Sequence, residues 1–326
     1  MRYYLVILQF LFVVALACVS SRPVPFEFAK PITAALSLWT AGLAFLITRT
    51  GLGSLSQDRP ISDFVFNLKE ETPTFVHAFW LALLLGFSLA LQSWGKSMIP
   101  YVTTFWADPI LADFDHWIFG QDPWRLFRSD FLAPAYYLVY FSWFVITFCA
   151  LGLLAFSKRD QSRPLVAYFA TLIFCGTFGQ YILPSAGPMF YERVGFGTRF
   201  SLLLQTNDPA YTRIADWLWA NYVARTPDLG AGISAMPSMH VALSVWSALA
   251  LSSLWRPLAL PGLIYVILIW CASIATGWHY ATDGLIGTLG AIAMWKLAGA
   301  KWFAVGNMRV PLIPRPALLT RKRRAA

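Results

Sequence analysis

Eight long apolar runs limit what this chain can fold into more than any other feature of the sequence. They cover approximately residues 3–20, 31–49, 75–95, 134–157, 165–183, 239–255, 257–276 and 283–303. A helix of roughly 20 apolar residues is long enough to cross the hydrocarbon core of a bilayer. The sequence therefore predicts an all-α, polytopic membrane protein with about eight transmembrane helices.

The composition excludes a water-soluble domain and argues against a nucleic-acid partner. Only 13% of the residues are charged and 58% are hydrophobic, whereas soluble domains carry about a quarter charged residues. A large share of the net charge of +9 lies in the basic segment 321–324. Beside a membrane span, such a segment is typical of a topology signal that contacts anionic lipids. We expect the membrane as a partner, and no nucleic acid.

The apolar runs divide the chain into three parts. Residues 1–70 carry two N-terminal runs, and the first of these fits either a retained helix or a cleaved signal peptide. Residues 71–303 carry the remaining runs and are predicted to form a six-helix membrane domain. Residues 304–326 are predicted to form a basic cytoplasmic tail.

Basic residues in the short connections orient the predicted helices. With the N-terminus inside, these basic connections also lie inside, as the positive-inside rule requires. Two longer connections, about 96–133 and 184–238, then lie outside. The second contains Trp217, Trp219 and Tyr222 at helical spacing. This spacing fits an amphipathic helix at the membrane interface, or else a simple tethering loop.

The first polar segment of interest is GISAMPSMH, residues 232–240, just before the sixth run. Proline is favoured at the first position of a helix, so Pro237 predicts a helix start here. The amides of Ser238, Met239 and His240 would then lack partners and could bind an anion such as phosphate. Ser238 adds a hydroxyl donor, and His240 can deliver a proton to a leaving oxygen near neutral pH.

The second segment is GWHYATD, residues 277–283, at the start of the eighth run. His279 and Asp283 are four residues apart, so a helix places them on one face. The Asp283 carboxylate can accept the proton of one imidazole nitrogen and leave the other as a nucleophile or base. Both segments begin helices that enter from the predicted outer face. We therefore expect His240 and His279 to face each other across one phosphate-sized gap.

At these residues the sequence resembles the type-2 phosphatidic acid phosphatase superfamily of lipid phosphatases and phosphotransferases. The second signature of that superfamily is matched by residues 237–240 (PSMH), and the third ends in the pattern from His279 to Asp283. Two further segments, 115–124 (DHWIFGQDPW) and 183–188 (LPSAGP), resemble the branch that contains fungal inositol phosphorylceramide synthase.

The resemblance implies a role for each matched residue. His279 would be the nucleophile that forms a phosphohistidine, and Asp283 would orient it. His240 would protonate the leaving group, and Ser238 would help to bind phosphate.

The sequence departs from the superfamily where positive charge is needed. The first signature, Lys-X6-Arg-Pro, is absent, and Ser273 stands where the third signature has an arginine. Phosphoryl transfer needs cations around the equatorial oxygens of the phosphorus. Arg193 follows the 183–188 segment on the predicted outer face, and we expect it to supply this charge. The alternative candidates are Arg199, Arg213 and Arg225.

Taken with the resemblance, these residues predict an enzyme of the cell membrane that cleaves a lipid phosphoester at the periplasmic, extracytoplasmic face. The motifs do not separate transfer to water from transfer to an alcohol. No metal or other cofactor is expected, because His, Ser, Arg and helix amides can stabilise the charge. Two alternatives stay open: a metal-dependent hydrolase with His240, His279 and Asp283 as ligands, and a non-enzymatic transporter with an ion path through these groups.

Overall fold

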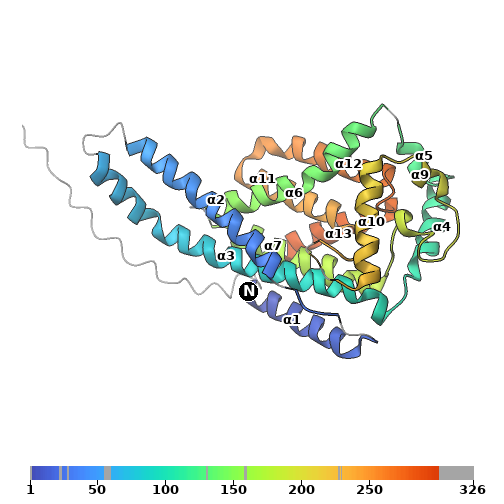
Figure 1. The fold of residues 1–326 in the computed structure, drawn as a ribbon. Helices are drawn as coiled ribbons and strands as arrows, with labels where there is room; N and C mark the ends of the chain where they lie inside the picture. The colour runs from blue at the N-terminus through green and yellow to red at the C-terminus, as the bar shows by residue number, and fades with distance from the viewer. Residues whose placement is uncertain are drawn as a thin grey trace, which may run out of the picture.

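A computed structural model describes residues 2–21, 24–27, 29–54, 60–129, 131–157, 160–226, 228 and 230–300. Over these residues the chain is helical and contains no strand (Figure 1). The predicted cytoplasmic tail, 304–326, lies outside the described residues. The helices are α1 (Arg2–Val19), α2 (Ala29–Ser54), α3 (Pro60–Val102), α4 (Ala107–Phe119), α5 (Trp124–Phe127), α6 (Ala133–Ala155), α7 (Ser162–Ile173), α8 (Gly179–Ile182), α9 (Ser201–Gln205), α10 (Pro209–Ala224), α11 (Met239–Leu254), α12 (Ala259–Ala275) and α13 (Ala281–Ala298).

Each of the eight apolar runs coincides with a helix wherever the structure describes it, and the protein is an integral membrane protein of the all-α class. By length and hydropathy, five described helical segments are able to cross a membrane: Arg2–Val19, Ile61–Val102, Ala133–Ala155, Ser162–Ile182 and Arg256–Ala275. The sixth run forms a shorter apolar helix, Met239–Leu254. A crossing by all eight helices remains the prediction from the sequence.

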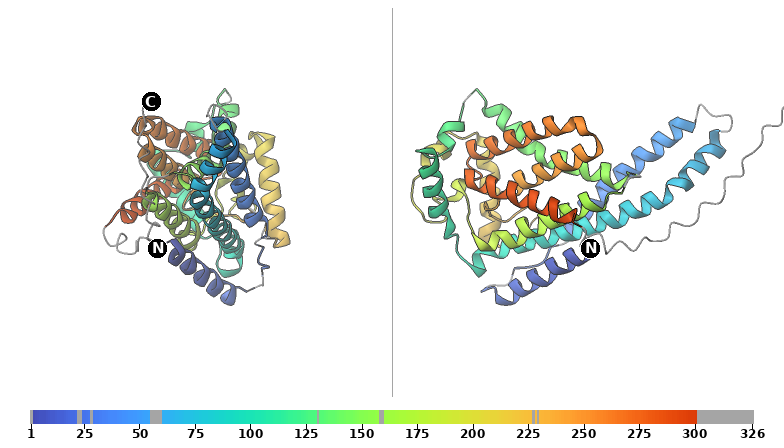
Figure 2. Two further views of the ribbon diagram at one scale, coloured as in Figure 1. Left: turned by 90° about the vertical axis from the view of Figure 1, so that its left-hand side faces the viewer. Right: turned by 180° about the vertical axis from the view of Figure 1, so that it is seen from behind.

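The helices α6, α7, α11, α12 and α13 pack around one another, with α3 along one side (Figure 2). Trp246 of α11 lies at their centre, where its ring packs edge-on against Tyr168 of α7. Its indole N–H donates a hydrogen bond of 2.8 Å to the carbonyl oxygen of Pro164. An indole at this depth needs such a partner because lipid offers none.

The third helix is much longer than its apolar run. It extends from Pro60 to Val102, and its first half forms a hairpin with α2 that projects from the other helices (Figure 1). The boundary that we predicted between residues 70 and 71 therefore falls inside a continuous helix. Helix length was underestimated because the first turns of α3 are polar, so hydropathy alone does not include them.

The two long connections both lie at the same end of the helices. They form α4, α5, α9 and α10, which gather around the starts of α11 and α13 (Figures 1 and 2). The segment around Trp217 and Trp219 is a helix, α10, and not a tethering loop. It begins at Pro209, and the Asp208 side chain caps it by accepting a 2.7 Å hydrogen bond from the amide of Ala210. We call this part of the molecule the polar end.

Candidate active site

The structure brings His240, His279 and Asp283 into one line at the polar end. The Nδ1 atom of His240 lies 2.9 Å from Nε2 of His279. On the other side of the His279 ring, Nδ1 lies 3.3 Å from Oδ2 of Asp283. His279 and Asp283 are buried, with 3% and 0% of their surfaces exposed. Side chains 39 residues apart in the chain thus form a continuous chain of polar contacts.

The order of these contacts assigns the protons. When Asp283 is ionised, it only accepts hydrogen bonds, and it then holds the His279 proton on Nδ1. The Nε2 atom of His279 then carries a lone pair, and His240 Nδ1–H is the donor in the bond between the rings. Asp283 is itself held, because its Oδ2 accepts a 2.9 Å hydrogen bond from the amide of Tyr280. The arrangement orients His279 with its unprotonated nitrogen toward His240.

The expected phosphate-sized gap between the two rings is wrong for this conformation. An attacking nitrogen needs to lie about 3 Å from phosphorus, and a proton donor needs to reach the leaving oxygen, which together require roughly 6–7 Å between the nitrogens. The observed 2.9 Å is a direct hydrogen bond. A sequence cannot predict this closure, because it depends on the side-chain torsions of two helix starts.

Aromatic side chains of α6 pack on His240. The ring of Tyr140 lies 4.7 Å from the imidazole, centroid to centroid, and Trp143 meets it edge-on at 5.0 Å. Tyr140 also stacks on Trp278, the residue before His279, at 6.4 Å. These apolar surfaces limit the positions that the His240 ring can take, and they shield it from water.

The start of α11 differs by one or two residues from the prediction. Met239 is the first helical residue and Ser238 is its N-cap, so Pro237 precedes the cap and is not at the first helical position. The Ser238 amide is not free, because it donates a 3.0 Å hydrogen bond to the carbonyl oxygen of Asp283. The Ser238 hydroxyl accepts a long bond of 3.4 Å from the amide of Val241. Within the described residues, the amides of Met239 and His240 have no partner.

The start of α13 is held by a carboxylate from a helix far away in the sequence. Asp115 of α4 accepts hydrogen bonds from the amides of Ala281 and Thr282, at 2.5 and 3.1 Å, and from the Thr282 hydroxyl. These amides are the unpaired donors of the first turn, which favour a negative charge. Burial raises the pKa of Asp115, while the bonds from Thr282 and Ala281 act in the opposite direction. Asp115 thereby fixes the helix that begins just after His279.

A second carboxylate of α4 holds the 183–188 segment. Asp108 accepts hydrogen bonds from the amides of Ala186 and Gly187, at 2.7 and 2.8 Å, and from the Tyr280 hydroxyl, at 2.8 Å. Gly187 has a φ of +90°, and a Cβ there would lie 2.7 Å from the carbonyl oxygen of Trp278. The close approach of these two segments therefore requires glycine. Burial outweighs the lowering effect of these three bonds, so that the pKa of Asp108 is raised to about 7.

Among the described residues, Lys96 of α3 is the cation whose charge acts on the two histidines, and the sequence analysis missed it. A loop passes directly over it, since a Cβ on Gly232 would lie 2.7 Å from the Lys96 Cβ. No carboxylate among the described residues pairs with it. The available signal was a single lysine near the end of a long apolar helix, because ionisable groups at such depth are often functional.

The structure does not bring Arg193 to this site. Its guanidinium pairs with Asp216 of α10 and lies 5.8 Å from the ring of Trp219. The expectation that Arg193 supplies the phosphate-binding charge is therefore not supported by this geometry. Proximity in the sequence to the 183–188 segment was misleading because the guanidinium of Arg193 packs against α10 instead.

Electrostatics favour a neutral His279. Burial and, to a smaller extent, the charge of Lys96 lower the pKa of His279 to about 3, while a hydrogen bond to the backbone of Ala235 acts in the opposite direction. An imidazole must be unprotonated to act as a nucleophile. At neutral pH, His279 is thus in the form that this chemistry needs.

The fold and the site define an all-α integral membrane protein with a histidine pair and a buried carboxylate at one end of its helices. The sequence matches the PAP2 superfamily over residues 111–297, and the chain belongs to this superfamily. Members of the superfamily are phosphatases. Neither the curated proteins nor the solved structures give a match to the chain.

Proposed function

We propose that this protein is a lipid phosphate phosphatase or phospho-headgroup transferase that works through a phosphohistidine on His279. The observation that carries the proposal is the line from Asp283 through His279 to His240, with contacts of 3.3 and 2.9 Å. It gives His279 a fixed proton on Nδ1 and, once the hydrogen bond to His240 opens, an available lone pair on Nε2. Superfamily membership supports phosphoester cleavage as the reaction class.

The reaction has two steps. In the first, Nε2 of His279 attacks phosphorus, the bond to the leaving oxygen breaks, and His240 gives a proton to that oxygen. In the second, water or an alcohol attacks the phosphohistidine, and His240 takes the proton of the attacking group. Both steps require the hydrogen bond between the histidines to open, so the observed conformation corresponds to the resting enzyme.

Lys96 and the start of α11 are proposed to bind the phosphate. The unpartnered amides of Met239 and His240 point to an anion site at a helix start, where the peptide dipoles are favourable. The Ser238 hydroxyl accepts from Val241, and its own hydrogen is free to donate to a phosphate oxygen. Lys96 takes the role that we first gave to Arg193.

A lipid substrate and an extracytoplasmic site are part of the same proposal. The polar end lies at the ends of membrane-spanning helices, so a phosphate bound there is at the level of lipid headgroups. The basic short connections support this face, because the positive-inside rule assigns them to the inner side and leaves the polar end outside.

We also propose that the protein belongs to the branch that contains inositol phosphorylceramide synthase. Both segments that carry this resemblance touch the site. The 115–124 segment supplies Asp115, which holds the start of α13, and the 183–188 segment binds Asp108. The acceptor in that case is an alcohol.

The geometry speaks against the metal-dependent alternative. A zinc ion needs ligands that converge at about 2.0–2.2 Å from one point. Here the two His279 nitrogens face opposite partners, His240 on one side and Asp283 on the other. These three side chains cannot share one ion in this conformation, and no other group of three suitable side chains lies in the part of the chain that the structure describes.

The test is turnover and trapping of the phosphoenzyme in detergent. Purified protein is given a panel of lipid phosphates labelled with ³²P, with and without acceptor alcohols and a chelator, and acid-labile label on the protein is measured. We expect His279→Ala to lose the label and at least about 10⁴ in turnover, because the nucleophile is gone. His77→Ala, on α3 and away from the site, is the matched control. Equal labelling of His279→Ala and wild type would refute the mechanism.

His240→Ala separates the acid from the nucleophile. Loss of a general acid costs about 10²–10⁴ in rate when the leaving group is a poor one. A nitrophenyl phosphate ester leaves without protonation, so its first step should be almost unaffected in His240→Ala. Equal losses on alkyl and nitrophenyl esters would exclude His240 as the acid. Transport activity that persists in both histidine variants would instead favour the transporter.

A further inference from the structure

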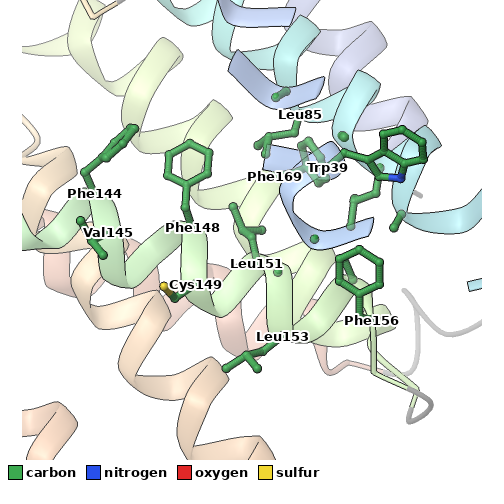
Figure 3. A pocket seen from close by; sticks show the side chains of 17 residues that line it. Trp39, Leu85, Phe144, Val145, Phe148, Cys149, Leu151, Leu153, Phe156 and Phe169 are labelled. Atoms are coloured by element: carbon green, nitrogen blue, oxygen red, sulfur yellow. The ribbon is translucent and has the colours of Figure 1, made fainter. Parts of the chain in front are cut away.

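Helix α3 carries two kinds of surface along its length. Leu81 and Leu85 line an apolar groove beside α2 and α6, and the residues around this groove carry no charge (Figure 3). Nearer the polar end, three polar residues follow one another every four positions: Ser88, Gln92 and Lys96. Residues four apart lie on one face of a helix. The groove therefore offers nothing to an anion, whereas this polar stripe of α3 offers hydrogen-bond donors.

The first residue of the polar stripe already has its partners. The Ser88 hydroxyl donates a 2.7 Å hydrogen bond to Oε1 of Gln9, and Nε2 of Gln9 donates to the Ser88 carbonyl oxygen and the Thr177 hydroxyl. Gln9 is thus a structural residue that joins α1 to α3 and to η1 (Phe174–Phe178). The side chains of Gln92 and Lys96, one and two turns further on, make no hydrogen bond or ion pair with any described residue.

The Gln92 side chain reaches the open start of α11. A Cβ built on Gly176 of η1 would lie 2.5 Å from Nε2 of Gln92 and 3.0 Å from Sδ of Met239, the first residue of α11. Both atoms occupy space that is free because Gly176 has no side chain. The donor end of Gln92 therefore lies beside the helix start at which the amides of Met239 and His240 have no partner among the described residues.

A second amide comes from the segment that faces α3. Gln180 of α8 follows Gly176 by four residues, about one helical turn, so both lie on the same side of this segment. The Tyr181 hydroxyl donates to the Gly95 carbonyl oxygen, which fixes α8 against α3 next to Lys96. Gln180 is 2% exposed, and its Oε1 has no hydrogen-bond partner among the described residues. Buried polar atoms are normally paired, so this amide needs a ligand.

We propose that the side-chain amides of Gln92 and Gln180 bind oxygen atoms of the substrate phosphate beside Lys96. This inference rests on the proposed function, and it adds two phosphate-binding residues to it. An amide presents two N–H donors, and a half turn exchanges its oxygen and nitrogen ends, so each glutamine can donate to a phosphate oxygen. One lysine and neutral amides then take the place of the cationic signature residues that the chain lacks.

Neutral donors suit a site that is empty between turnovers. A buried cation without a partner costs far more free energy than an amide without one. A second unpaired cation would also repel Lys96, whereas an amide does not. The two amides are satisfied when an anion binds, so anion binding should stabilise the folded protein.

The test compares the same substitution at three glutamines. Binding of octyl phosphonate, which is not cleaved, is measured by calorimetry in detergent for Gln92→Met, Gln180→Met and Gln9→Met. We expect Kd to rise roughly tenfold in the first two, because each loses a hydrogen bond to a charged group. Gln9→Met is the matched control and should keep the Kd of the wild type. Equal Kd values in the wild type, Gln92→Met and Gln180→Met would overturn the inference.

Thermal unfolding without phosphonate separates binding from structural support. Gln92→Met and Gln180→Met remove unpaired amides and keep the side-chain volume, so Tm should not fall. Gln9→Met removes an amide that has three hydrogen bonds, and its Tm should fall. A fall in the Tm of Gln92→Met as large as that of Gln9→Met, with Kd unchanged, would make Gln92 a structural residue and refute its role in binding.

Gln92→Glu is a second variant at the same position. It keeps the shape of the side chain and opposes the anion with a negative charge, so its Kd should exceed that of Gln92→Met. A Kd equal to that of the wild type would contradict the proposal.

Phosphonate binding needs no turnover, so its result is separate from that of the proposed function. A wild type that cleaves no phosphoester, yet loses phosphonate affinity in the Met variants, would refute the proposed function and support the amide site. Cleavage of phosphoesters with kcat/KM unchanged in Gln92→Met and Gln180→Met would support the proposed function and refute the amide site.

Discussion

The starts of α11 and α13 lie side by side, yet they are built in opposite ways. At α13, the first amides are taken by the Asp115 carboxylate, and Asp283 accepts from Tyr280. At α11, a long 3.4 Å bond from Val241 to Ser238 is the cap, and the next two amides have no partner among the described residues. One start is already neutralised by carboxylates, and the other is open to an anion.

The difference explains how one site can hold both a nucleophile and a phosphate. A helix start that carries the nucleophile must keep its position, and buried carboxylates from α4 fix it. A second start that binds phosphate must leave its amides available. The carboxylates also make the α13 start unattractive to phosphate, so the anion is directed to the α11 start and to Lys96.

Removal of the cation on the open side should have the largest effect. Lys96→Met is expected to lower kcat/KM by about 10²–10³, the usual loss when one stabilising group at a phosphate or oxyanion is removed. It should also raise the pKa of His279, because the charge of Lys96 disfavours the imidazolium. The acidic limb of kcat/KM against pH should then move to higher pH.

Lys96→Arg keeps the charge and serves as the control for this prediction. Its acidic limb should stay with that of the wild type even if its turnover falls. An unchanged limb in Lys96→Met would mean that Lys96 is too far from His279 to matter, and the cation would have to be sought elsewhere.

Loss of the carboxylate at the closed start should have an intermediate effect. Asp115→Ala leaves the buried amides of Ala281 and Thr282 without acceptors, which costs about 1–3 kcal/mol of stability. A displacement of His279 by about 1 Å would lower kcat by up to roughly 10²-fold. Thermal unfolding and kcat measure the two consequences.

Asp113→Ala is the matched control on the same helix, because Asp113 is largely exposed and pairs with Arg199. Its stability should change by less than about 0.5 kcal/mol. Asp115→Asn should recover part of both losses, since the amide oxygen still accepts one bond. Full activity in Asp115→Ala would show that α13 needs no support from α4.

The smallest effect is expected at the open start itself. Ser238→Ala removes a cap whose bond to Val241 is long, so the stability loss should stay below about 1 kcal/mol. Activity should fall by less than about tenfold, because the hydroxyl is one donor among several. An activity loss as large as that of Lys96→Met would contradict this expectation. It would mean that the Ser238 hydroxyl is a main phosphate ligand.

The membrane class and the pairing of the two motifs were predictable because they depend on local patterns. Apolar runs of bilayer length predict helices, and a four-residue spacing puts His279 and Asp283 on one face. Two runs joined by one returning helix place His240 near His279. These steps involve short segments, so neither loop conformations nor long-range packing was needed.

What the sequence could not supply depends on contacts between distant segments. Asp115 reaches the start of α13 across 166 positions in the chain, and nothing local to α4 indicates this. Lys96 was hidden by its place in an apolar helix, whereas Arg193 was favoured only by its nearness to a motif. The closed histidine pair is likewise a result of packing, since Tyr140 and Trp143 fix the His240 ring.

Gln9 of α1 has a consequence for how the chain is assembled. In the finished protein its side-chain amide donates to the Ser88 carbonyl oxygen and to the Thr177 hydroxyl, at 3.1 Å each, and so joins α1 to two other helices. In hydrocarbon an amide without such partners is costly. Thr177 is synthesised 168 residues after Gln9, so α1 takes its final position only after the segment that carries Thr177 has been inserted. Docking of α1 is therefore a late event in biogenesis compared with the insertion of α1 itself.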